Sequence, residues 1–125
     1  MGMDPRQPKH VLVVDDEEDI REFLTVVLEQ SGYRVSTADN GAMALRKVDE
    51  EPVDVVLLDM RMPIMDGWAF AEAYRQWPGP RAPIVVLTAA RDAAARAAQI
   101  GAEDYLPKPF DLGEVLTVVA RHAGR

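Results

Sequence analysis

The segment that most constrains the fold of this chain is residues 55–58, which read VVLL. Four consecutive branched apolar residues predict a strand that is covered on both faces, because a strand with one face in water alternates apolar and polar residues. Similar runs occur at residues 10–14 (HVLVV) and 84–88 (IVVLT). The run at 55–58 ends on the carboxylate of Asp59, and a proline that cannot pair within a central strand follows soon after. The sequence therefore predicts a buried sheet with an acid at the end of one strand.

Helical patterns alternate with these strands. The first spans the residues before Ser31-Gly32, where a glycine can end a helix, and its apolar residues follow the i, i+3, i+4, i+7, i+8 spacing of an amphipathic helix. Two weaker strands are expected at residues 34–38 and 103–106, and the breaker segment 77–83 (WPGPRAP) is expected to be a loop. The helices are predicted from Ile20, Phe23, Leu24, Val27 and Leu28; from Ala44, Leu45 and Val48; from Asp66-Gly67 with Phe70 and Tyr74; over the Ala-rich residues 91–100; and from Leu112, Val115, Leu116 and Val119.

Five strand–helix units in succession predict an α/β fold with a parallel sheet. Right-handed crossovers place helices on both faces, which favours a doubly wound open sheet. Five units are too few to close an eight-stranded barrel. The 125 residues are enough for one domain, and no linker, repeat or low-complexity tract divides them. We therefore expect one doubly wound domain.

Composition excludes several classes of protein. The chain has no cysteine, which excludes disulfides and thiolate metal sites and is compatible with a reducing compartment. No apolar stretch approaches the roughly 20 residues that span a bilayer, and residues 1–10 have no signal-peptide core. The net charge of −7 argues against broad binding to nucleic acid or to anionic membranes. We expect a cytoplasmic domain that binds neither.

Polar residues follow the ends of four predicted strands. Asp15 and Asp16 follow the first strand, Asp59 the third and Lys108 the fifth, and Thr88 ends the fourth. Parallel strands bring these ends to one edge of the sheet, where ligands bind in this architecture. Three converging carboxylates repel one another and need a proton, a cation or an ammonium group. Their hard oxygens favour a hard divalent ion, Mg²⁺ where phosphoryl groups also bind, and the lysine and threonine suit phosphoryl oxygens.

These residues, in this order, resemble the receiver domains of bacterial two-component response regulators. The resemblance spans roughly residues 9–122 and leaves residues 1–8 as an N-terminal extension, which we interpret as partly derived from cloning. It implies a flavodoxin-like fold with the strand order 2-1-3-4-5, Mg²⁺ as the cofactor, and a histidine kinase or histidine phosphotransfer protein as the phosphoryl donor. The matching segments are Asp15-Asp16, DMRMPIMDG at 59–67, Thr88-Ala89 and YLPKPF at 105–110.

The resemblance implies a phosphoacceptor and a set of metal ligands. Asp59 matches the phosphoacceptor. Asp15 and Asp16 match the acidic pair that holds Mg²⁺ together with Asp59, Asp16 more directly and Asp15 partly through water. The main-chain carbonyl of Arg61 matches a further metal ligand. The side chains of Arg61 and Ala90 match positions that flank the phosphoryl group, so substitutions there are expected to change the dephosphorylation rate.

The resemblance also implies a conformational switch that responds to phosphorylation. Thr88 and Ala89 match the residues that contact the phosphoryl group, and Lys108 matches the ammonium that pairs with it. Tyr105 matches an aromatic side chain whose rotamer changes when the threonine moves, with a core aromatic as the alternative interpretation. Pro109 matches a proline preceded by a cis bond. Phosphorylation adds about −1.5 to −2 charge and is expected to change the surface formed by the fourth helix, fifth strand and fifth helix. Such a domain signals to an output partner and is not a classical enzyme.

Three alternatives remain at this point. An aspartyl-phosphate phosphatase of similar fold should have a second acid two residues after its nucleophile, where this chain has Arg61, and room for a cap domain. A flavodoxin-type flavin carrier should have a phosphate loop after the first strand, where DDEED at 15–19 would repel a phosphate. A receiver used only as a constitutive binding module is a third, against which the intact site residues count.

The resemblance also bears on self-association. Receivers of one winged-helix subfamily dimerise through ion pairs on the fourth helix, fifth strand and fifth helix. Asp104 matches the strand acid of those pairs, but Val118 stands where the pairing arginine would fall, and an acid without its partner is costly at an interface. We therefore expect a monomer, or a weak dimer of another geometry, with Val118 on the outer side of the last helix. His10 and His122 lie near no motif and are expected on the surface.

Overall fold

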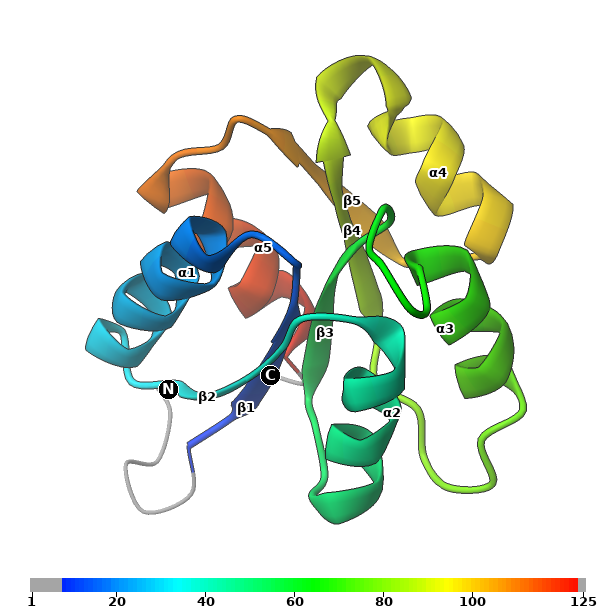
Figure 1. Cartoon of the computed structure of the whole chain (residues 1–125). Coiled ribbons are helices and arrows are strands. Elements are labelled where there is room, and N and C mark those ends of the chain that lie inside the picture. Colours follow the sequence, from blue (N-terminus) through cyan, green and yellow to red (C-terminus); the bar gives the residue numbers. More distant parts are fainter. Residues whose placement is uncertain (1–7, 124–125) are drawn as a thin grey trace.

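The computed structural model describes residues 8–123, so most of the expected extension 1–8 lies outside the described residues (Figure 1). Strands and helices alternate along the chain. The elements are β1 (His10–Val14), α1 (Glu18–Gln30), β2 (Arg34–Ala38), α2 (Gly41–Glu50), β3 (Val55–Asp59), α3 (Gly67–Arg75), β4 (Ile84–Ala89), the short 3₁₀ helix η1 (Ala90–Asp92), α4 (Ala93–Ile100), β5 (Asp104–Lys108) and α5 (Leu112–His122). None of the described helices is long and apolar enough to cross a bilayer.

The strands form one parallel sheet in the order β2-β1-β3-β4-β5. Helices α1 and α5 cover one face, and α2, α3 and α4 cover the other (Figure 1). The predicted doubly wound fold and its strand order are confirmed. The strand order reverses between β1 and β3, where the fold places its ligand site.

The core has two layers because successive strand residues point to opposite faces. Val11 and Val13 of β1 face the layer under α1 and α5, whereas Leu12 and Val14 face the layer under α2, α3 and α4. Every residue of β1 and β3 is buried. Continuous apolar runs therefore mark the central strands, as the sequence predicted.

The buried stripe of α5 differs from the prediction. Leu112 is 51% exposed, whereas Val118 is 5% exposed and belongs to the core. The helix packs through Val115, Val118 and Val119, which share one face at the i, i+3, i+4 spacing. Leu112 lies in the first turn, before this contact begins. The expectation that Val118 lies on the outer side of the helix is wrong.

Both histidines also differ from the prediction. His10 is 2% exposed, with Nδ1 2.8 Å from the carbonyl oxygen of Pro52 and Nε2 2.7 Å from Oγ of Ser36. His122 Nε2 lies 2.8 Å from Oδ2 of Asp104. Neither is a free surface histidine, because each ring finds partners on other elements that the sequence pattern did not reveal.

Candidate functional site

Three carboxylates meet at the carboxyl ends of β1 and β3. The two strands are neighbours, with Val14 in register with Leu58, so the residues that follow, Asp15 and Asp59, come side by side. Ligand atoms of Asp15, Asp16 and Asp59 all lie within 4.8 Å of one another. Asp15 and Asp59 are buried and Asp16 is exposed. The predicted acidic cluster is present, and its geometry could hold a metal ion.

Lys108 brings a positive charge to this cluster from the end of β5. Its Nζ donates to Oδ2 of Asp15 at 2.9 Å and lies 3.5 Å from Oδ1 of Asp59. It also lies 3.4 Å from Oε1 of Glu17, a contact that sequence reasoning missed. Asp15 has two further contacts: the amide of Glu17 donates to its Oδ1 at 2.9 Å, and the Arg21 side chain donates from Nη1 to its carbonyl oxygen at 2.9 Å. The start of α1 thus fixes the orientation of Asp15.

Burial and crowding shift the pKa values of these groups. Desolvation, followed by the charge of Asp15, raises the pKa of Asp59 from 3.8 to about 7, although Lys108 acts against the shift. Desolvation also raises the pKa of Asp15 against its hydrogen bonds from Glu17 and Lys108. Burial alone would lower the pKa of Lys108, but the Asp15 hydrogen bond and the surrounding carboxylates outweigh it and raise that pKa. Lys108 compensates the charge of the buried carboxylates only in part, so the site favours binding of a further cation.

The other predicted site residues lie on β4 and β5. Thr88 and Ala89 end β4 beside the end of β5, with Ala89 in register with Lys108. The peptide bond between Lys108 and Pro109 is cis. Tyr105 is 42% exposed and lines a groove between β5 and α5, so it is not a core aromatic. The edge therefore gathers the three acids, the lysine and the end of β4, while the tyrosine faces outward.

The loop between β3 and α3 is held close to Asp59. Asp66 caps α3 by accepting a hydrogen bond from the amide of Ala69 at 2.9 Å, which confirms its expected role in starting the helix. The amide of Gly67 donates to the carbonyl oxygen of Met60 at 2.9 Å. A Cβ at Gly67 would lie 2.7 Å from Met60 Sδ and 2.8 Å from the Asp59 carbonyl oxygen, so only glycine fits. Arg61, in this loop, is exposed.

Ile64, in the same loop, has an unusual backbone conformation. Its φ of 70° lies in the left-handed region, which a β-branched residue rarely adopts. Its side chain is 85% exposed and so gains little from burial. The tight loop between the end of β3 and the start of α3 imposes this conformation on a residue that does not favour it.

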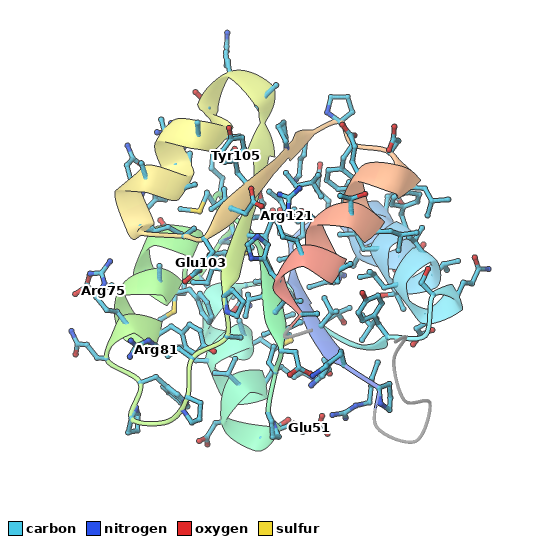
Figure 2. All side chains as sticks on the ribbon, turned by 180° about the vertical axis from the view of Figure 1, so that it is seen from behind. Glu51, Arg75, Arg81, Glu103, Tyr105 and Arg121 are labelled. Atoms are coloured by element: carbon cyan, nitrogen blue, oxygen red, sulfur yellow. The ribbon has the colours of Figure 1, made fainter. Side chains whose placement is uncertain are left out.

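Asp104 has partners within its own chain. Arg121 Nη1 donates to its Oδ2 at 2.7 Å, and His122 Nε2 lies 2.8 Å from the same oxygen. Figure 2 shows Arg121 on α5 beside the Tyr105 region of β5. Burial opposes ionisation of Asp104, but these bonds and the Tyr105 amide outweigh it and lower its pKa. Residues one turn beyond Val118 thus give Asp104 two basic partners within the chain. The expected absence of the ion-paired dimer stays a prediction.

The family comparison shows to which family this chain belongs. The sequence model of the response regulator receiver domain matches residues 11–120. The chain belongs to this family. Receiver domains are the phosphoacceptor signalling modules of two-component systems, and they are not classical enzymes. The flavodoxin and phosphatase alternatives are therefore not the families to which this chain belongs.

Curated relatives of this receiver domain are longer than the chain. The DNA-binding transcriptional regulator NtrC of Escherichia coli (strain K12) is 43% identical over 113 residues, which are 89% of this chain and 24% of NtrC. The transcriptional regulatory protein KdpE of Mycobacterium tuberculosis (strain ATCC 25618 / H37Rv) is 44% identical over 108 residues, 85% of this chain and 47% of KdpE. The chain thus spans about a quarter to a half of the length of these relatives.

Solved structures match the receiver domain over nearly its whole length. The chemotaxis response regulator CheY4 of Vibrio cholerae has a TM-score of 0.81 and 33% identity, covering 92% of this chain and 98% of CheY4. A putative response regulator from Chloroflexus aurantiacus J-10-fl has a TM-score of 0.87 and 35% identity, covering 95% of this chain and 100% of its own. The fold is therefore that of known receiver domains.

Proposed function

We propose that this domain, over residues 9–122, accepts a phosphoryl group on Asp59 from the phosphohistidine of a histidine kinase or a histidine phosphotransfer protein. One observation carries the proposal: three carboxylates lie within 4.8 Å of one another, and Lys108 Nζ is 3.5 Å from Asp59. This arrangement of charges at the sheet edge suits the transfer of an anionic group to a carboxylate. We also propose the cytoplasm as its location, where two-component donors present their phosphohistidines.

The donor set of the acidic cluster fits Mg²⁺. All of its ligand atoms are hard carboxylate oxygens, to which the main-chain carbonyl of Arg61 would add another. The raised pKa of Asp59 supports the fit, because it indicates a site where negative charge is undercompensated. Asp15, Asp16, Asp59 and Arg61 would hold the ion. When bound, Mg²⁺ supplies charge neutralisation for the transferring phosphoryl oxygens.

The side chains have separate roles in the transfer. A carboxylate oxygen of Asp59 attacks the phosphorus in line, the bond from phosphorus to the donor imidazole breaks, and an acyl phosphate forms on Asp59. The transition state of phosphoryl transfer is loose, so positioning and charge stabilisation dominate. Lys108 pairs with a phosphoryl oxygen, and Thr88 donates its hydroxyl hydrogen to another.

The output surface is proposed on α4, β5 and α5. Thr88 moves toward the new phosphoryl oxygens, and Tyr105 follows it from its half-exposed position beside α5. The added charge of about −1.5 to −2 at the site biases this rearrangement. An output partner of unknown identity then reads the changed surface. The domain itself binds neither nucleic acid nor membrane, consistent with its net charge of −7.

Phosphorylation by a small donor tests the proposal. The domain is incubated with acetyl phosphate or phosphoramidate and Mg²⁺, and its intact mass is measured under acid conditions. We expect one phosphoryl adduct that disappears in Asp59→Asn and when EDTA removes the metal. Asp49→Asn, which changes an exposed acid of α2, is the matched control and should keep the adduct. An adduct that persists in Asp59→Asn would place the acceptor elsewhere and overturn the proposal.

A further inference from the structure

Trp68 of α3 contacts two guanidinium groups. The Cζ atom of Arg61 lies 5.6 Å from the indole centroid, and that of Arg96 lies 5.4 Å from it. The indole Nε1 donates to Oε1 of Gln99 at 2.9 Å. Arg61 comes from the loop after β3, whereas Arg96 and Gln99 come from α4. One half-buried side chain therefore joins the loop next to the phosphoacceptor to two helices.

Arg61 follows the acidic cluster closely in sequence but makes its contact elsewhere. It lies two residues after Asp59, close in sequence to a cluster that contains Asp15, Asp16 and Asp59 with Lys108 as their cation. A guanidinium free to move would be attracted to these carboxylates, which match its planar fork. Within residues 8–123, however, no ion pair joins Arg61 to an acid, and its recorded contact is with Trp68. Cation–π contacts and partly exposed ion pairs are similar in strength, so the indole can decide the position.

Gln99 and Arg96 keep the indole in place for this contact. The hydrogen bond from Nε1 to Gln99 fixes the ring from the α4 side, and Arg96 Nη1 lies 3.5 Å from the same Gln99 oxygen. The ring also packs against the core layer under α2, α3 and α4. Trp68 is thus a fixed surface against which the exposed Arg61 side chain lies.

We propose that Trp68 is a positioning residue of the phosphorylation site, which holds the Arg61 guanidinium against α3 and α4 and so keeps a competing positive charge away from the cation site. The inference rests on the proposed function, because the cation is the Mg²⁺ assigned to Asp15, Asp16 and Asp59. Released from the indole, Arg61 would pair with these carboxylates, occupy oxygens that the ion needs, and repel it. The main-chain carbonyl of Arg61 could then serve the ion less well.

The affinity for Mg²⁺ itself measures this effect. In a water-like dielectric, moving a unit charge from about 12 Å to about 5 Å from a divalent cation, roughly where a guanidinium paired with the ion's carboxylates would lie, weakens binding of the ion by about fivefold. We expect Trp68→Leu to raise the Kd for Mg²⁺ by about fivefold in calorimetric titrations at low ionic strength, where screening is weak. Trp68→Phe keeps an aromatic face for the guanidinium and should stay within about twofold of the wild type.

A second substitution separates positioning from a structural role. If Trp68 acts through Arg61, then Trp68→Leu should have no effect in an Arg61→Gln background, where no guanidinium remains to be released. A loss of Mg²⁺ affinity that persists in Arg61→Gln would show that Trp68 acts through the fold and would overturn the inference. Wild-type affinity in Trp68→Leu would overturn it as well.

Two further measurements keep the test decisive. If Trp68→Leu does not fold, incorporation of 5-fluorotryptophan in a Trp77→Phe background weakens the ring face at Trp68 alone, and we expect about a twofold weaker Mg²⁺ affinity. An unchanged affinity there would refute the positioning role. A domain that binds Mg²⁺ with the predicted order of variants but gains no phosphoryl adduct would overturn the proposed function alone. A domain that binds Mg²⁺ and gains the adduct, but whose Mg²⁺ affinity is unchanged in Trp68→Leu, would overturn this inference alone.

Discussion

Replacing Asp59 by asparagine should stabilise the metal-free domain at alkaline pH. Its side chain is 11% exposed and lies among Asp15, Asp16 and Lys108. Desolvation and then the charge of Asp15 raise the pKa of Asp59 from 3.8 to about 7. The folded protein therefore holds the Asp59 proton more tightly than the unfolded chain does. The ionised Asp59 carboxylate therefore destabilises the folded state, and asparagine removes this charge.

The size and sign of the effect follow from this shift. A change from 3.8 to about 7 corresponds to about 4 kcal/mol at roughly 1.4 kcal/mol per pKa unit. Because folding takes up a proton on Asp59, the contribution of this group favours the folded state most at low pH. That contribution declines as the pH rises from about 4 to about 7, and the full penalty is present above it. The asparagine amide is a weaker acceptor for Lys108, so we expect a net gain of about 2–4 kcal/mol at about pH 8.

Urea unfolding in EDTA at about pH 8 and about pH 5 measures this difference. The advantage of Asp59→Asn over the wild type should shrink by more than half at the lower pH, where folded Asp59 is protonated. Asp49→Asn, which changes an exposed acid, should show neither the gain nor its pH dependence. An Asp59→Asn variant no more stable than the wild type at about pH 8 would refute the reasoning, because the carboxylate would then be well compensated by Lys108.

Three other substitutions have definite expected outcomes. Lys108→Ala should keep or strengthen Mg²⁺ binding, since it removes a cation from among carboxylates, and should weaken the change that beryllofluoride causes in NMR spectra. A folded variant that no longer binds Mg²⁺ would contradict this prediction. Asp104→Ala should cost about 1 kcal/mol in urea unfolding, because it breaks partly exposed pairs within one chain, and should leave the sedimentation coefficient unchanged; a dimer lost in this variant would show an interface through Asp104. Ile64→Asn should raise the free energy of unfolding by about 0.5–1 kcal/mol, because asparagine tolerates the left-handed conformation better and little burial is lost. A less stable variant would show that side-chain contacts of Ile64 outweigh its backbone strain.

The sequence by itself determined the sheet and the edge that carries the site. The apolar runs of β1, β3 and β4 are buried because no water-facing strand could tolerate them, and parallel strands place their following residues at one edge. Asp15, Asp16, Asp59 and Lys108 could therefore be predicted to meet. Their chemical roles stay proposals, because convergence alone does not show a phosphoryl group moving.

Only the tertiary structure decided which stripe of a helix is covered and which side chains meet across the fold. Val118 and Leu112 both fit an apolar face of α5 by spacing, and the position of the helix over the sheet buries the first and exposes the second. Glu17 and Lys108 are 91 residues apart in sequence, and Trp68 and Gln99 are 31 apart. Sequence periodicity specifies neighbours within one element, whereas such contacts depend on how separate elements pack, so no local pattern contains them.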